Sequence, residues 1–135
     1  MLQPKRSRYR KHHKPVYRCV AKNTTQLRFG DYGIRALSSG RLSARHVEAL
    51  RRVCTRICRR QGRIWLCVYP HWVVSRKSAE SRMGKGKGAV DRWVAVVKPG
   101  TVLYEIGNVK PTLAENALIS AAKKLPMKCS IIGRD

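Results

Sequence analysis

The chain has 135 residues, of which 30 are Lys or Arg and only 7 are Asp or Glu, so its formal net charge at pH 7 is +23. The length suits one compact domain, and a hydrophobic content of 43% excludes a disordered polybasic tail. A folded protein of this charge repels itself, so we expect a negatively charged partner: nucleic acid, an anionic membrane or an acidic protein.

The first 14 residues are strongly basic and include no acidic residue. They lack apolar periodicity, so we expect a flexible arm that orders only against a partner. No apolar run follows them as in a secretory signal, and no stretch is long enough to span a membrane. The five cysteines, an odd number, argue for reduced thiols. The arm residues that we expect to contact RNA are Lys5, Arg6, Arg8, Arg10, Lys11 and Lys14.

The first regular elements are two short strands and a helix. Residues 15–22 and 26–37 are rich in aromatic and β-branched side chains and are interrupted by glycines, which predicts strands with a bend or bulge. A helix is predicted over 44–61, because Ser43 is a good N-cap and Gly62 follows the last turn.

This helix has two different faces. At 3.6 residues per turn its apolar stripe consists of Val47, Leu50, Val53, Cys54, Ile57 and Cys58. The other side carries Arg45, Arg52, Arg56, Arg59 and Arg60. A solvated charged face is the alternative, but such a face usually alternates Glu with Arg, and Glu48 is the only acid here. We therefore expect these arginines to contact phosphate groups.

After the helix, the pattern of apolar and β-branched residues predicts further strands at 63–69, 93–97, 101–106 and 127–132. A turn at Lys98-Pro99-Gly100 would join the second and third of these strands as a β-hairpin. Thr112 and Glu115 resemble a capping box for a helix over 113–124. Together these elements predict an α+β fold: a mainly antiparallel sheet packed with two amphipathic helices, forming one domain over 15–135 beside the 1–14 arm.

Residues 75–92 have no apolar period and predict a long basic loop of the kind that is commonly functional. Glycine lets the backbone approach another surface closely, and its N–H groups can bind phosphate oxygens between flanking lysines. The loop residues that we expect to bind RNA are Arg76, Lys77, Arg82, Met83, Gly84, Lys85, Gly86, Lys87 and Gly88. A flexible solvated loop is the alternative.

Three other chemistries are disfavoured. Gly84, Gly86 and Ala89 match a dinucleotide fingerprint, with Glu105 as its acid, but no helix follows the glycines. Cysteines and a histidine have a spacing that suggests zinc (Cys54, Cys58, Cys67 and His71), but two of them lie on the core stripe of the helix. The carboxylates are scattered and no nucleophile motif appears, so we expect no enzyme, no cofactor and no small-molecule substrate.

Several motifs together resemble the ribosomal protein L-sixteen family, the bacterial and organellar form of a universal large-subunit protein. They occur in order along nearly the whole chain: MLQPKR at 1–6, FGDYG at 29–33, GRLSAR at 40–45, RQGRIW at 60–65, RMGKGKG at 82–88, WVAVVKPG at 93–100 and KKLP at 123–126. The first motif and RMGKGKG are the most specific.

The resemblance implies a structural protein that binds large-subunit rRNA near the peptidyl-transferase centre and on the A-site side of the tRNA path. It also implies a late step in subunit assembly, help in placing the acceptor arm of aminoacyl-tRNA, and contacts with tRNA in the A-site and P-site region and with neighbouring ribosomal proteins. By matching motifs, the arm, the Gly/Lys loop, Arg41 and Arg45 would face RNA.

The chain departs from the family pattern at 71–75, where His71-Trp72-Val73-Val74-Ser75 replaces an acid and a proline. Trp72 and Val73 would offer an apolar patch to a neighbouring protein. This departure and the five cysteines favour a mitochondrial ribosome over the bacterial cytoplasm or the plastid stroma. Two alternatives stay open: binding to anionic membranes through the 44–61 helix, and a free RNA chaperone or regulator outside the ribosome.

Overall fold

A computed structural model describes residues 2–15 and 19–134 of the chain. Its elements are β1 (Tyr32–Ala36), β2 (Gly40–Ser43), α1 (Ala44–Ile57), β3 (Arg63–Leu66), β4 (Trp72–Arg76), β5 (Ala89–Val97), β6 (Val102–Gly107), α2 (Pro111–Ala122) and β7 (Cys129–Gly133). No helix in the described part of the chain is long and apolar enough to cross a membrane.

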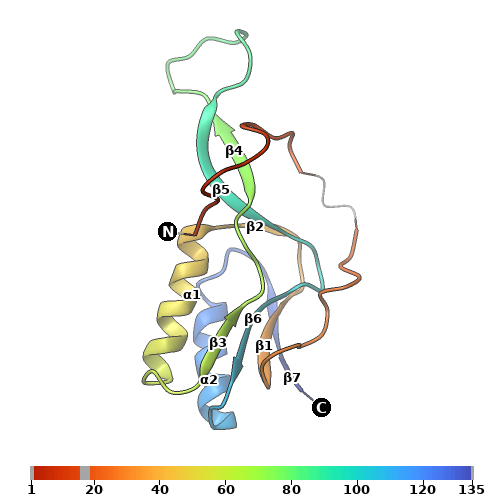
Figure 1. The fold of residues 1–135 in the computed structure, drawn as a ribbon, viewed down its shortest axis with the longest axis vertical. Coiled ribbons are helices and arrows are strands. Elements are labelled where there is room, and N and C mark those ends of the chain that lie inside the picture. The colour runs from red at the N-terminus through yellow and green to blue at the C-terminus, as the bar shows by residue number, and fades with distance from the viewer. Residues whose placement is uncertain (1, 16–18, 135) are drawn as a thin grey trace.

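The strands form two antiparallel sheets, β3-β6-β1-β7 and β2-β5-β4. Helices α1 and α2 lie side by side against the four-stranded sheet, while β4 and β5 extend beyond the body of the protein as a long ribbon (Figure 1). The predicted α+β class, with two helices on mainly antiparallel strands, is therefore confirmed, although the strands are divided between two sheets.

The start of α1 agrees with its sequence signal, whereas its end does not. Ser43 caps the helix: its Oγ accepts a hydrogen bond from the N–H of His46 at 3.4 Å, and its own N–H donates to Nδ1 of His46 at 3.4 Å. The helix ends at Ile57, before the predicted residue 61, because Arg59 and Arg60 adopt left-handed conformations with φ of 49° and 64°.

The apolar stripe of α1 faces the core as predicted. Val47, Leu50, Cys54 and Cys58 are fully buried, and Val53 and Ile57 pack against them. Tyr104 of β6 donates its hydroxyl hydrogen bond to the carbonyl of Val47 at 2.6 Å, which ties the first turns of the helix to the sheet. Burial raises the pKa of the Tyr104 hydroxyl, so it remains a donor at neutral pH.

The predicted hairpin between 93–97 and 101–106 is wrong. Both strands exist, but β5 pairs with β2 and β4 while β6 pairs with β1 and β3. The turn itself forms, since the N–H of Thr101 donates to the carbonyl of Lys98 at 3.2 Å. Its backbone then bonds to the end of β1: Gly100 donates to the carbonyl of Ala36 at 2.7 Å. The turn therefore passes the chain from one sheet to the other.

Other boundaries also differ from the sequence prediction. Of the strand predicted at 15–22, residues 16–18 lie outside the described part and 19–22 form no strand; of 26–37, only β1 is extended. Strand β3 ends at Leu66, and the predicted strand at 127–132 is β7. Strand β4 falls where we predicted none and takes up the start of the long loop.

Helix α2 begins earlier and by another mechanism than predicted. Lys110 is its N-cap without a side-chain hydrogen bond, and Pro111 occupies the first helical position, where its missing N–H costs nothing. The capping box of Thr112 and Glu115 is therefore wrong. The alanine side is as predicted, since Ala114, Ala117, Leu118 and Ala121 are buried.

The position of α1 predicts the effect of shortening its core side chains. The side chain of Leu50 is fully buried, so Leu50→Ala leaves a cavity in the core. We expect this change to lower the free energy of unfolding by about 2–5 kcal/mol, measured by urea denaturation. The control Arg56→Ala, on the exposed side of the same helix, should change it by less than about 0.5 kcal/mol. Equal losses in the two variants would show that the helix faces the core differently.

Candidate nucleic-acid interface

The N-terminal arm carries the first group of predicted RNA-binding residues. Residues 2–15 form no helix or strand, and all six basic side chains named above are exposed. Leu2 packs against the hydrophobic core, so the beginning of the arm is anchored to the domain. The middle of the arm runs beside the ribbon of β4 and β5 (Figure 1).

The arm contacts the outer edge of β4, which differs from our expectation that it orders only against a partner. Strand β4 ends the order β2-β5-β4, so one row of its backbone groups faces away from the sheet. The N–H of Val73 donates to Nδ1 of His12 at 3.0 Å, and Trp72 donates its indole N–H to the carbonyl of His13 at 3.1 Å. The rings of His12 and Trp72 lie 4.8 Å apart. Trp72 is therefore partly covered by the chain's own arm.

Two lysines join the arm to the following loop. Lys11 donates from Nζ to the carbonyl of Lys87 at 3.0 Å, and Lys87 donates from its Nζ to the carbonyl of His12. The two positively charged segments thus lie together in the folded chain. The positive charges of the two segments repel each other. A polyanion that binds across both segments would offset this repulsion and be attracted by both.

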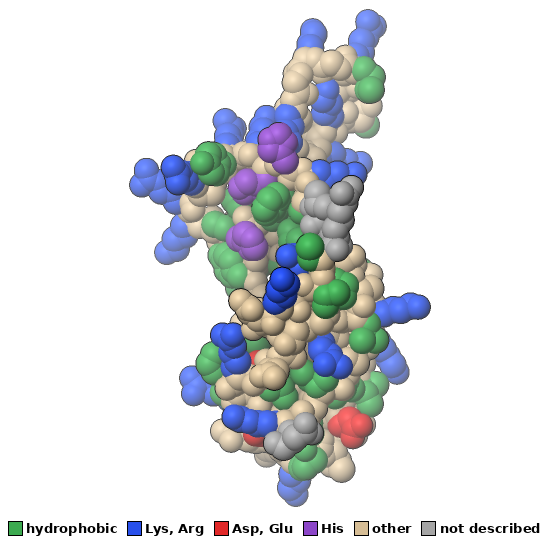
Figure 2. Space-filling view, turned by 90° about the vertical axis from the view of Figure 1, so that its right-hand side faces the viewer, with side chains coloured by type: hydrophobic (Ala, Val, Ile, Leu, Met, Phe, Trp, Pro, Cys, Tyr) green, Lys and Arg blue, Asp and Glu red, His purple; other side chains and the backbone are tan. Residues whose placement is uncertain are grey.

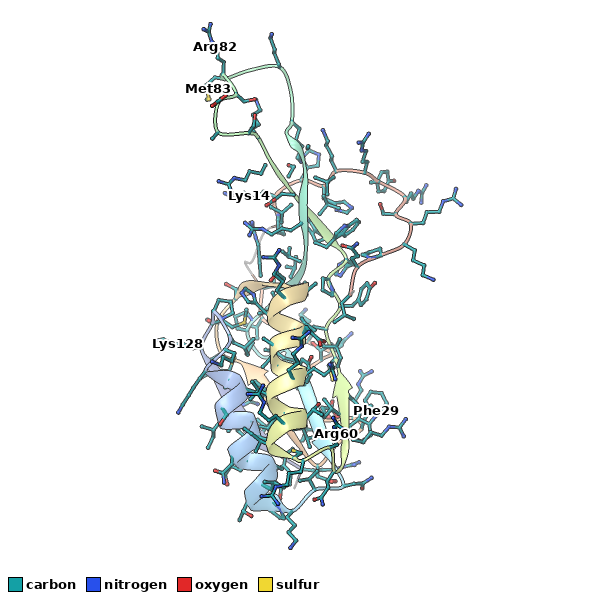
Figure 3. The ribbon with its side chains drawn as sticks, turned by 90° about the vertical axis from the view of Figure 1, so that its left-hand side faces the viewer. Lys14, Phe29, Arg60, Arg82, Met83 and Lys128 are labelled. Carbon is teal, nitrogen blue, oxygen red and sulfur yellow. The ribbon has the colours of Figure 1, made fainter. Side chains whose placement is uncertain are left out.

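The loop between β4 and β5 consists of residues 77–88, shorter than predicted because Arg76 and Ala89 belong to the strands. It projects from one end of the molecule, with Arg82 and Met83 at its tip (Figure 3). Met83 is 97% exposed. Predicted residues 76, 77 and 82–87 are exposed, and Gly88 is half-buried.

The backbone at the loop tip is left-handed, and the described part of the protein does not pack closely around its two glycines. Gly84, Lys85 and Gly86 are all left-handed, with φ of 89°, 54° and 79°. No atom of the described chain lies within 4 Å of a Cβ built on Gly84 or Gly86, so packing within the protein does not require glycine there. Lys77 donates from Nζ to the carbonyl of Gly84, which closes the loop on itself.

The basic face of α1 is smaller than predicted. Glu48 accepts hydrogen bonds from Arg51 at 2.7 and 2.9 Å and from Arg52 at 3.0 Å, and these bonds lower the pKa of its carboxyl to about 2. Arg59 and Arg60 lie after the helix, in its left-handed turn. The predicted face therefore reduces to Arg45 and Arg56 on the helix itself, with Arg52 held by an acid of the same helix.

A groove beside the start of α1 brings together side chains from β2, α1, β4 and β5 and from Pro126. It has a volume of about 410 Å³ and is lined by Arg41, Ser43, Arg45, His46, Val74, Arg92, Val94 and Pro126. Arg41 and Arg45 were predicted to face RNA, whereas Arg92 of β5 was missed. No local sequence pattern could place Arg92 in this groove, because its position there depends on the pairing of β2 with β5. Arg92 also forms an ion pair with Asp91 at 3.3 Å.

The charged side chains are distributed unequally over the surface. On the face in Figure 2, Lys and Arg side chains extend from the loop to the opposite end, whereas acidic side chains appear only in the half away from the loop. On this face, the half that carries the arm and the loop thus shows basic side chains and no acidic ones.

The residues of the rejected alternatives have other roles in the fold. Glu105, the candidate ribose acid, is 1% exposed and accepts backbone hydrogen bonds. Cys54 and Cys58 are buried in the core, and burial raises the pKa of the Cys54 thiol to about 12. In residues 2–15 and 19–134 no three His, Cys, Asp or Glu side chains gather as a metal site.

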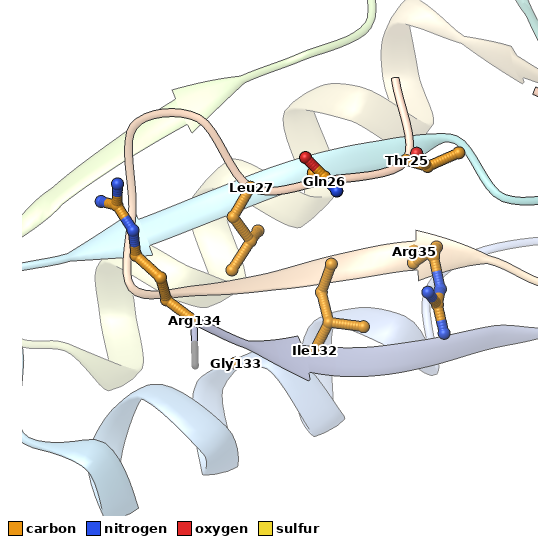
Figure 4. A pocket seen from close by; sticks show the side chains of 7 residues that line it. All are labelled: Thr25, Gln26, Leu27, Arg35, Ile132, Gly133 and Arg134. Carbon is orange, nitrogen blue, oxygen red and sulfur yellow. The ribbon is translucent and has the colours of Figure 1, made fainter. Parts of the chain in front are cut away.

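A second hollow lies where residues 25–27 cross the face of the four-stranded sheet opposite the helices (Figure 4). It has a volume of about 450 Å³ and is lined by Thr25, Gln26, Leu27, Arg35, Ile132, Gly133 and Arg134. Among the described residues that line it, the charged side chains are both arginines.

These features define a class: a basic α+β protein with the surface of a polyanion binder. The family profile Ribosomal protein L16p/L10e matches residues 4–132, and the chain belongs to this family. The resemblance described above is confirmed. The chain is therefore a ribosomal protein, a structural component and not an enzyme.

Relatives cover almost the whole chain. The "Large ribosomal subunit protein uL16" of Gluconacetobacter diazotrophicus is 49% identical over 99% of this chain and 97% of its own length. The protein of the same name from Erythrobacter litoralis is 49% identical, over 99% of this chain and 93% of its own. The "Large ribosomal subunit protein uL16c" of Trieres chinensis is 48% identical, over 99% of this chain and 98% of its own.

The contacts of Trp72 predict that this residue holds the arm on β4. Trp72→Ala removes one hydrogen bond and one ring contact, worth together about 1–3 kcal/mol. The amide of Val73 should then exchange its hydrogen about 5- to 150-fold faster, because it is protected only while His12 accepts it. Exchange is measured by NMR. Tyr69→Ala, which removes a more exposed aromatic ring just before β4, should leave the exchange unchanged. An unaffected Val73 amide in Trp72→Ala would mean that the arm is held elsewhere.

Proposed function

We propose that the chain is a structural constituent of the large ribosomal subunit that binds large-subunit rRNA near the peptidyl-transferase centre and on the A-site side of the tRNA path. In this role it supports late subunit assembly and the placement of the acceptor arm of aminoacyl-tRNA. The proposal combines family membership with a basic loop whose outward glycine backbone has no packing role in the chain.

The loop supplies the observation that carries the proposal. A contact with RNA backbone needs positive charge and N–H groups that no other part of the protein occupies. Gly84, Lys85 and Gly86 are left-handed, and Lys85 and Lys87 lie in the loop at the end of a ribbon that projects from the body of the protein. The arm lies against the base of this ribbon, so RNA that reaches the loop also meets the arm.

The predicted interface comprises three groups of residues. The arm contributes its six basic side chains, α1 and its surroundings contribute Arg41, Arg45, Arg52, Arg56, Arg59 and Arg60, and the ribbon contributes residues 76, 77 and 82–88. Other partners in this role are tRNA in the A-site and P-site region and neighbouring ribosomal proteins. The five cysteines and the departure at 71–75 favour a mitochondrial ribosome over a bacterial or plastid one.

Sedimentation of a cell extract tests the ribosomal role. We expect nearly all of the protein in the fractions of large subunits and intact ribosomes, detected with an antibody or an affinity tag. A free RNA chaperone or regulator, the alternative function, would instead leave most of the protein near the top of the gradient.

The role of the loop is tested by the salt dependence of RNA binding. Replacing Lys85 and Lys87 by Ala should weaken binding of the purified protein to large-subunit rRNA and reduce the slope of log K against log salt by up to about one unit for each lost phosphate contact. The control replaces Lys123 and Lys124, which are exposed after α2, by Ala. The same decrease in both double variants would show that only total charge matters.

A further inference from the structure

The FGDYG segment places the aromatic side chain of Phe29 on the surface, beside one other aromatic ring. Phe29 is the only phenylalanine of the chain and is 61% exposed. Its ring stacks on Trp65 of β3, with ring centroids 6.2 Å apart and planes 19° from parallel. The guanidinium of Arg63 lies 5.6 Å from the centroid of the Trp65 ring. An arginine and two aromatic rings thus form one stacked group.

The backbone of Phe29 is held firmly by a buried carboxylate. Glu105 accepts the N–H groups of Arg28, Phe29 and Gly30, the shortest from Phe29 at 2.7 Å and from Gly30 at 2.8 Å. A Cβ on Gly30 would lie 2.7 Å from the carbonyl oxygen of Ile106, so glycine is needed for this close approach to β6.

The ionised state of Glu105 maintains this arrangement. Burial acts to raise the pKa of its carboxyl, but the hydrogen bonds from Gly30, Phe29 and Arg28 outweigh burial and hold the pKa below its usual value. The carboxylate is therefore charged at neutral pH and binds all three N–H groups. The exposed ring is fixed to a core strand and does not belong to a loose loop.

We propose that Phe29 is the outer face of a stacking platform that binds one unpaired nucleobase of RNA. The proposal rests on the proposed RNA-binding function and adds a residue that is not among the predicted RNA-binding residues. Figure 3 shows Phe29 near the level of Arg60, far along the molecule from Arg82 and Met83. The loop and the platform therefore contact different parts of the RNA.

Chemistry favours a base over an apolar protein segment at this position. Single-stranded RNA is bound by aromatic rings on which bases stack, with arginines close by to bind the phosphates. Phe29 has Arg28 beside it in the chain, Arg63 lies over the ring of Trp65, and both arginines are exposed. The guanidinium of Arg28 donates to the carbonyl of Asn23 at 3.0 Å, which restricts its side chain. A docking surface for a protein would present a broader apolar patch.

The binding test separates the base from the phosphate. Purified full-length protein is titrated with an oligouridylate and with an abasic ribose–phosphate oligomer of equal length and charge. Phe29→Leu should weaken oligouridylate binding by about 5- to 150-fold and leave abasic binding unchanged, whereas Phe29→Tyr should retain both. Equal weakening for the two oligomers, or no weakening for either, overturns the proposal.

A cross-link identifies the partner in the ribosome. Large subunits that carry a photoreactive benzoylphenylalanine at position 29 are irradiated, and the product is analysed by mass spectrometry after nuclease and protease digestion. A nucleotide joined to residue 29 supports the platform; a peptide of another protein, or no cross-link in subunits that contain the chain, overturns it. Absence of the chain from the subunits would instead contradict the ribosomal function itself.

Discussion

The excess of positive charge is the constraint on which the whole structure depends. Of the 7 acidic residues, several are engaged in the chain's own structure: Glu48 with two arginines of α1, Asp91 with Arg92, and Glu105 with backbone N–H groups. The first 14 residues contain no acid, and the loop at 77–88 contains one, Glu80, against four basic residues. Since the repulsion between those segments is not neutralised internally, the folded chain is complementary to a polyanion and is better stabilised with one than alone.

The fold keeps this charge away from its core. The helices and the four-stranded sheet enclose an apolar interior, while the basic segments lie on a strand edge, on a projecting ribbon and in a groove at the start of α1. The arm covers backbone groups at the outer edge of β4 that would otherwise be open to another strand. Thus the same contact protects a sheet edge and brings two like-charged segments together.

The sequence predicted the apolar stripe and the N-cap of α1, but it failed for the N-cap of α2 and wherever the pairing partners are distant in the chain. The stripe of α1 and the cap at Ser43 depend on neighbours within a few turns, and both were predicted correctly. The turn at 98–100 was also correct, but a turn does not determine which strands pair: Gly100 bonds to Ala36, far away in the chain. For the same reason no local pattern indicated that Trp72 meets His12 or that Arg92 joins Arg41.

Glu105 matched the spacing of a ribose-binding acid, an alternative that the sequence disfavoured because no helix follows the glycines. Its carboxylate instead accepts hydrogen bonds from the N–H groups of residues 28–30. Its lowered pKa means that the stabilisation is complete above the ordinary pKa of glutamate, about 4.3, and is lost as the pH falls through the value in the folded state. Protonation would leave at least one of the three N–H groups with a weaker partner and loosen the segment that carries Phe29. The orientation of this exposed ring therefore depends on a buried charge on β6, which is why neither residue reveals its role when the sequence is considered alone.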